Sequence, residues 1–237
     1  NLAIAGIAIG TVLLPNLSKY VEKKDTKKIK FIQNKSLELS IFLSLPATFA
    51  LLISSKQVTS ALFGYGSFDF ISVINSANAL FYFALGLPAF ALIKVFSSYI
   101  FARQNTKTPF IFSLYSVLVN IFISVYFFSD MGFIIIPIAT TISSWFNAIL
   151  LFGHLTKKKY FIFDNLLSLA LLKIFISSIL TSILFYKLIN YFDYLLAYES
   201  EYKLLTIIFI VIITFIAYML ISIFTKAFKI SDIKLKY

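Results

Sequence analysis

The sequence contains no cysteine and a single histidine, His154. Without cysteine the chain cannot form disulfides or thiolate metal sites, and one histidine excludes a histidine-rich metal site. Motifs of the HExxH and GxSxG types, a phosphate-binding glycine loop and an aspartate-rich pair for magnesium–diphosphate chemistry are also missing. We therefore expect neither an enzyme activity nor a cofactor.

Charged residues are scarce and apolar residues dominate. Only 13% of the 237 residues are charged, 60% are hydrophobic, and the mean hydropathy is +0.92. The first apolar run, residues 2–14, is roughly 20 Å long at about 1.5 Å per residue, which is short of the ~30 Å hydrocarbon core. Six longer apolar spans follow at residues 36–55, 74–101, 109–128, 133–153, 166–186 and 204–224. The pattern predicts an all-α polytopic bundle of one truncated helix, in which the chain begins, plus six full transmembrane helices.

The positive charges lie mainly in alternate connections between the spans. Of the 21 Lys and Arg, 16 lie in the connection at residues 15–35, the connections after the third and fifth spans, and the basic tail at residues 226–236. The opposite connections hold only Lys56, Lys187 and Lys203. The positive-inside rule places the lysine-rich side and the C-terminus in the cytoplasm. The net charge of +11 therefore needs no nucleic-acid partner, and the expected partner of the apolar surface is the lipid bilayer.

Two charged residues lie inside predicted spans at some depth. Glu38 is about one turn inside the second span, and Lys94 is about two turns from the cytoplasmic end of the third. A buried charge costs a few kcal/mol by insertion scales, so such residues usually face a partner or a wet cavity. They are candidates for a substrate pathway, and both lie on the cytoplasmic side, where they could form a pair with each other. The alternative is that both side chains reach the headgroups, as we expect for Lys173.

Other polar or helix-breaking residues within the spans suggest bends and contacts between helices. Pro46 and Pro88 lie in mid-span, where each removes a backbone hydrogen bond and bends its helix. Asn75, Asn78, Asn120 and Asn147 are expected to hydrogen-bond between helices. Bent helices are common in alternating-access transporters, but also in membrane proteins that do not move.

Four stretches resemble the MurJ/MviN family of lipid II flippases, in the multidrug/oligosaccharidyl-lipid/polysaccharide exporter superfamily. Residues 6–18, GIAIGTVLLPNLS, resemble the family signature GxAxGTxxLPxLS, and residues 36–47 and 62–68 are similar to later stretches. Residues 86–109 are the most specific. They end in FARQNTKTP, a cytoplasmic connection motif containing Arg103, Gln104, Lys107 and Pro109.

The resemblance implies a fourteen-helix protein of two six-helix lobes plus two extra C-terminal helices. Residues 1–153 would be the C-terminal lobe of the transporter core, with part of helix 8 and helices 9–12. Residues 154–237 would be a cytoplasmic loop, the two additional helices and the basic tail. Such proteins move an undecaprenyl-diphosphate-linked peptidoglycan precursor across the bacterial inner membrane by alternating access. Their cavity arginines lie in segments preceding Asn1, so the missing N-terminal lobe is an expected partner, and Lys94 is the only deep cation in this chain.

Two other functions remain open at this stage. The first is export of another lipid-linked saccharide or a drug within the same superfamily. The second is that of a non-transporting membrane partner or the inactive remnant of a split gene. An integral-membrane transferase is less well supported, because the required carboxylate pair is absent.

Overall fold

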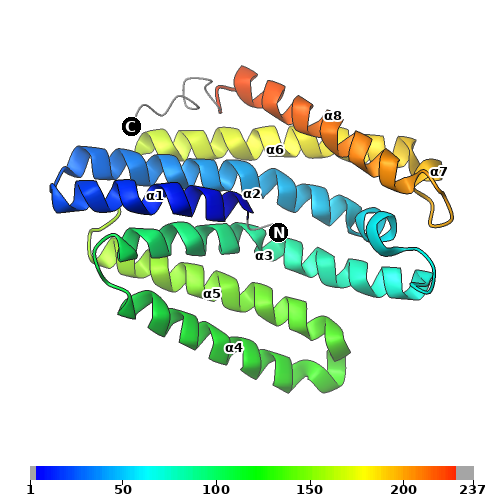
Figure 1. The fold of residues 1–237 in the computed structure, drawn as a ribbon, viewed down its shortest axis with the longest axis horizontal. Coiled ribbons are helices and arrows are strands. Elements are labelled where there is room, and N and C mark those ends of the chain that lie inside the picture. Colours follow the sequence, from blue (N-terminus) through cyan, green and yellow to red (C-terminus); the bar gives the residue numbers. More distant parts are fainter. Residues whose placement is uncertain (1–3, 228–237) are drawn as a thin grey trace. The chain divides into compact units, whose positions relative to one another are not determined.

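Every regular element in the described part of the chain is helical. The structure is a computed structural model and describes residues 4–227, with side chains from Leu13 onward. The elements, in order, are α1 (Ile4–Glu22), α2 (Thr26–Phe63), α3 (Phe70–Phe101), α4 (Lys107–Met131), the 3₁₀ turn η1 (Gly132–Ile134), α5 (Ile135–Lys157), α6 (Asn165–Tyr191), α7 (Asp193–Leu196) and α8 (Lys203–Phe224) (Figure 1). The predicted all-α fold is confirmed.

Five stretches of the described chain are long and apolar enough to cross a membrane. They are Thr26–Phe63, Phe70–Phe101, Lys107–Lys157, Asn165–Tyr191 and Lys203–Phe224. The third contains both α4 and α5, which run in opposite directions as a hairpin closed by η1 (Figure 1). At about 1.5 Å per residue, each of these two helices exceeds the ~30 Å hydrocarbon core. Six full spans follow α1, as the sequence predicts.

The helices extend beyond the predicted spans, most clearly around the first basic segment. Residues 15–35 are predicted as a connection, but α1 continues through Pro15 to Glu22 and α2 begins at Thr26. This basic segment is largely helical because lysine has good helix propensity and a helix can continue once it has left the hydrocarbon. The Lys28 N–H donates to Asp25 Oδ1 over 3.1 Å, which satisfies one of the free N–H groups at the start of α2. Lys229, Lys234 and Lys236 of the predicted tail lie outside the described residues.

The connection between α2 and α3 contains the two glycines that predict a tight turn. Gly66 has a φ of +58°, a conformation that favours glycine. At Gly64 an added Cβ would lie 2.7 Å from the backbone oxygen of Ser60, so a side chain cannot fit there. Asp69 then begins α3 by accepting a hydrogen bond of 2.8 Å from the Ser72 N–H. Hydrogen bonds from the Ser72 side chain and backbone lower the pKa of the Asp69 carboxyl.

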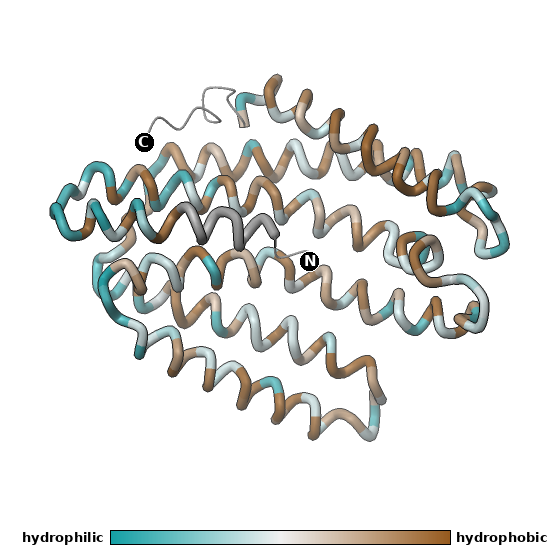
Figure 2. The backbone as a smooth tube through the Cα atoms, viewed as in Figure 1, coloured by the Kyte–Doolittle hydropathy of each residue, from teal (hydrophilic) through white to brown (hydrophobic). Residues whose placement is uncertain are grey.

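The hairpin of α4 and α5 has polar contacts inside and apolar side chains outside. Asn120 Nδ2 donates to Thr140 Oγ1 over 3.1 Å, and Asn147 Nδ2 lies 3.5 Å from Ser113 Oγ, which confirms the predicted contacts for these two asparagines. On the outer side Phe110 is 69% exposed. This arrangement suits a lipid bilayer, in which apolar side chains face outward and polar side chains need a partner within the protein. Hydrophobic residues also run along α8, and hydrophilic ones gather between α1 and α2 (Figure 2).

The described chain forms two compact units. The first comprises the chain up to Ser44 together with Leu85–Ser168, and the second comprises Leu45–Ala84 together with the chain from Leu169. The second unit has a core of buried apolar side chains from α2, α6, α7 and α8, namely Ala61, Phe185, Ile189, Leu196, Ile207 and Ile210. The sequence predicts another division, after residue 153, which separates the transporter core from the two additional C-terminal helices. That division stays a prediction.

Candidate functional site

Lys94 and Glu38, the two charges predicted at depth, have different surroundings in the first unit. Glu38 Oε1 accepts a hydrogen bond of 2.6 Å from Lys35 Nζ, one turn earlier in α2. Lys94 is exposed on α3 and forms no salt bridge with any other described residue. A pair between Glu38 and Lys94 is therefore not formed, because a neighbour three residues away on the same helix neutralises the carboxylate.

The predicted connection motif surrounds Arg103, which follows the C-terminus of α3. Arg103 Nη1 donates to the Tyr99 carbonyl over 2.5 Å, and Nη2 donates to the Tyr160 carbonyl over 2.9 Å. The guanidinium also lies 4.4 Å from the centroid of the Tyr160 ring. Burial lowers the pKa of Arg103 from its ordinary value, although a guanidinium remains charged in proteins. Arg103 thus holds the segment after α5 against the end of α3.

The other residues of this motif shape the entry into α4. Gln104 is exposed and has a φ of +58°, and Lys107 is the exposed first residue of α4. Pro109 is buried in the first turn, where its missing N–H is not needed. Asn105 Oδ1 accepts a hydrogen bond of 3.1 Å from the Thr108 N–H. These contacts are structural, and none of them assigns a ligand.

Tyr99 is a residue of this region that sequence reasoning did not identify. Its side chain is fully buried, its hydroxyl donates to the Gln33 carbonyl over 2.5 Å, and it lies 2.8 Å from Ser36 Oγ. Its ring stacks on Phe161 with centroids 5.9 Å apart. Tyr99 therefore joins α2, α3 and the segment after α5. In the sequence, the four-residue spacing between Tyr99 and Arg103 indicates that both lie on the same face of a helix.

A second pair of contacts holds the segment after α5 against α2. Lys30 Nζ lies 3.3 Å from Asp164 Oδ2, and Asn34 Nδ2 donates to the Ile162 carbonyl over 3.4 Å. Both contacts are solvent-exposed, so each contributes little to stability. Together with Arg103 they form one structural end of the first unit. Lys94 lies about two turns away along α3 and is exposed.

The predicted helix bends at Pro46 and Pro88 lie inside α2 and α3. The backbone of α2 keeps helical dihedral angles around Pro46, and its irregular residue is Ser54, with φ of −122° and ψ of 19°. Pro88 is buried and lies inside the continuous helix α3. Their role as bends therefore stays a prediction.

Lys203 in the second unit is another residue whose role the sequence did not reveal. The apolar spans place it in a connection, but it is the first residue of α8 and only 2% exposed. Its Nζ donates to the carbonyls of Gly64 over 2.6 Å and Tyr198 over 2.5 Å. It also lies 4.2 Å from the centroid of the Tyr65 ring. Lys203 thereby ties the α2–α3 connection to the α7–α8 connection.

Comparison with known proteins gives a consistent result. A family model described as lipid II flippase MurJ matches residues 1–206. A probable lipid II flippase MurJ of Rickettsia prowazekii (strain Madrid E) is 34% identical over 207 residues, which is 87% of this chain and 40% of that protein. The protein of the same name from Rhizobium meliloti (strain 1021) is 40% identical, over 65% of this chain and 29% of its own length. The chain thus spans less than half the length of these relatives.

The fold agrees with a solved structure. The lipid II flippase MurJ in an inward closed conformation superimposes with a TM-score of 0.75, over 95% of this chain and 44% of that one. The sequence identity of 22% means that this likeness concerns the fold alone.

Proposed function

Because this chain belongs to the lipid II flippase MurJ family, we propose that it is the C-terminal part of a transporter that moves a lipid-linked peptidoglycan precursor across the bacterial inner membrane. The family is one of transporters and not of catalytic enzymes. The proposed substrate is the undecaprenyl-diphosphate-linked precursor, and the N-terminal lobe would complete the transport path. In this proposal the lysine-rich connections face the cytoplasm.

The observation that carries a substrate role is the position of Lys94. It lies seven residues before the end of α3, about 10 Å from that end at 1.5 Å per residue. Its side chain is exposed and forms no salt bridge with the other described residues, whereas Glu38 is paired with Lys35. A diphosphate needs cations, and an ammonium at this depth is costly unless it has a polar partner. We propose that Lys94 contacts the diphosphate during transport by alternating access.

Replacing Lys94 by alanine tests this role. The chain would be joined to the N-terminal part of the Rickettsia prowazekii relative, and flipping would be measured in reconstituted vesicles. We expect the initial rate to fall about tenfold or more, because a hydrogen bond to a charged group contributes roughly 1.5–3 kcal/mol. Lys94→Arg should keep most of the activity.

Lys173→Ala is the matched control, since Lys173 is also a lysine inside a membrane-spanning helix, α6. It should flip substrate at the rate of the parent chimera. If Lys94→Ala and Lys173→Ala flip substrate at equal rates, Lys94 does not contact the substrate and its side chain only reaches the headgroups. A parent chimera with no flipping at all, despite normal insertion, would instead contradict the proposed function.

We also propose that Pro46 and Pro88 act as bends during transport. The two compact units meet along the chain between Ser44 and Leu45 in α2 and between Ala84 and Leu85 in α3. A helical proline cannot bond to the carbonyl four residues earlier, which is residue 42 for Pro46 and residue 84 for Pro88. Each missing hydrogen bond therefore spans a boundary between the units. Each helix therefore lacks one backbone hydrogen bond at the point where one unit continues into the other.

Replacing both prolines by alanine should slow flipping several-fold while thermal stability stays equal or rises, because each alanine supplies the missing N–H. The measurement is the flipping rate of the same chimera together with its melting temperature. Pro109→Ala is the control, since a proline in a first helical turn removes no helical hydrogen bond. An unchanged rate in the double variant would show that the prolines are passive.

A further inference from the structure

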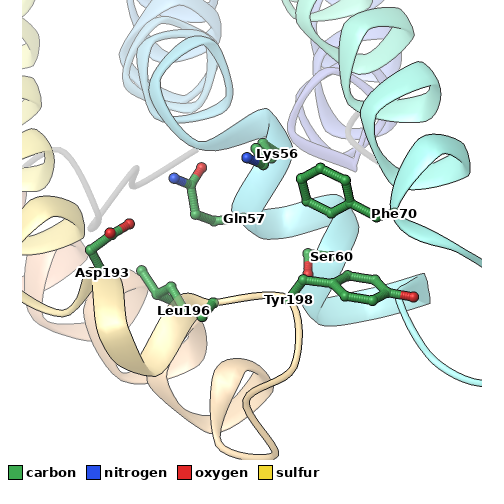
Figure 3. Close-up of a pocket in the computed structure, with 8 residues that line it drawn as sticks. Lys56, Gln57, Ser60, Phe70, Asp193, Leu196 and Tyr198 are labelled. Atoms are coloured by element: carbon green, nitrogen blue, oxygen red, sulfur yellow. The ribbon is translucent and has the colours of Figure 1, made fainter.

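A small cavity in the second unit combines groups that the transport proposal does not use. It has a volume of about 200 Å³ and lies between the last turns of α2, the start of α3, and α7 with the turn that follows it. Lys56, Gln57 and Ser60 line it from α2, and Asp193 lines it from α7 (Figure 3). A typical drug-sized site is about 300–1,000 Å³, so this cavity suits a ligand smaller than a drug molecule.

The aromatic wall of the cavity is held in place by contacts of Tyr198. The Tyr198 hydroxyl donates to the Phe68 carbonyl over 2.8 Å, and the Tyr198 ring meets the Phe70 ring edge-on with centroids 5.6 Å apart. Lys203 holds the backbone carbonyl of Tyr198. Phe70 and Tyr198 both line the cavity, so its aromatic wall is fixed by these contacts.

The polar groups of the cavity are not paired with one another. Lys56 and Asp193 carry opposite charges on the same cavity, yet the salt bridges among described residues are Lys30–Asp164 and Lys35–Glu38. The Lys56 ammonium lies instead 4.8 Å from the centroid of the Phe70 ring. Ser60 Oγ is buried and has no hydrogen-bond partner among the described residues. A buried hydroxyl without a partner costs free energy unless a ligand or water satisfies it.

These groups match a ligand that carries both charges. Lys56 and Ser60 are four residues apart on one face of α2, so they can bind one anionic group together. Asp193 lies across the cavity and can accept hydrogen bonds from a primary ammonium, with Gln57 between the two charges in Figure 3. The exposed tyrosines nearby, Tyr191, Tyr194 and Tyr202, are typical of the level where a membrane meets water. Groups at that level are lipid headgroups.

We propose that this cavity binds a phosphoethanolamine group, with the phosphate on Lys56 and Ser60 and the ammonium on Asp193. The membrane level indicates phosphatidylethanolamine as its source, and a soluble phosphoethanolamine ester has the same chemistry. The site is independent of Lys94, which belongs to the other compact unit. Its function is to bind a membrane lipid and not the transported substrate.

Binding would be measured on the full 237-residue chain in detergent, by titration followed with native mass spectrometry. The probes are dihexanoyl phosphatidylethanolamine, dihexanoyl phosphatidylglycerol and glycerophosphoethanolamine. We expect the ethanolamine lipid to bind at least fivefold more tightly than the glycerol lipid. Asp193→Asn should abolish that preference, and Lys56→Gln should weaken both lipids at least fivefold.

Lys187→Gln and Glu199→Gln are matched controls, because both are exposed residues of the same unit that do not line the cavity. They should bind both lipids as the parent does. Binding of glycerophosphoethanolamine as tight as that of the lipid would support the site and assign it to the soluble molecule. Equal binding of the two lipids, or loss of preference in the control variants as well, would overturn the proposal.

Discussion

Replacing Lys203 by methionine is expected to lower the free energy of unfolding by roughly 2–5 kcal/mol. Methionine fills a similar volume but cannot donate to the carbonyls of Gly64 and Tyr198, and a buried acceptor left unsatisfied costs about 1–3 kcal/mol. The variant also lacks the ammonium that lies over the Tyr65 and Tyr198 rings in the parent chain. The cost of burying an ammonium offsets part of this loss, which keeps the net effect below the sum.

The measurement is denaturant or thermal unfolding of the full chain in detergent, followed by circular dichroism. Lys187→Met is the matched control, because Lys187 is an exposed lysine of α6 in the same unit. It should change the free energy of unfolding by less than about 0.5 kcal/mol, as surface substitutions usually do. If the two variants unfold alike, the contacts of Lys203 contribute nothing net to stability.

The membrane architecture was predictable because it depends on the order of residues along the chain. Apolar runs predict six spans after a shorter first helix, and six such helices follow α1. The ends of the helices were less predictable, because hydropathy marks the hydrocarbon and not the backbone. Helix α2 therefore begins at Thr26 and ends at Phe63, although its apolar part covers residues 36–55. The tight turn after α2 depends on one residue type, because Gly66 has a left-handed backbone that glycine adopts readily.

Individual side-chain roles were harder to predict, because their partners are backbone carbonyls far away in the sequence. Lys203 bonds to Gly64, 139 residues earlier, and no property of a carbonyl distinguishes one residue from another in a sequence. Tyr99 bonds to Gln33 in the same way. Glu38, in contrast, found a partner three residues away, so helical spacing alone could have identified Lys35. Arg103 was located by its motif, but the motif did not predict what it contacts.

Replacing Arg103 by leucine should raise tryptic cleavage at Lys157, Lys158 and Lys159 about tenfold to a hundredfold. The Arg103 Nη2 bond to the Tyr160 carbonyl anchors the chain directly after this lysine run. A hydrogen bond from a charged donor contributes roughly 1.5–3 kcal/mol, and the accessible population of a segment rises by the corresponding factor when the bond is lost. The rate would be followed by mass spectrometry of the full chain during limited proteolysis in detergent.

Arg103→Lys distinguishes geometry from charge in this cluster. A guanidinium can donate to two separated carbonyls from two nitrogens held in one plane, whereas an ammonium can bond to two carbonyls only where both converge on one nitrogen atom. Lysine should therefore keep the positive charge but lose most of the protection, with cleavage close to that of the leucine variant. Lys107→Gln serves as the control, because it removes an exposed charge at the start of α4 without changing the contacts of Arg103. Full protection in Arg103→Lys would mean that charge alone holds this segment, and the two carbonyl contacts would then have no role of their own.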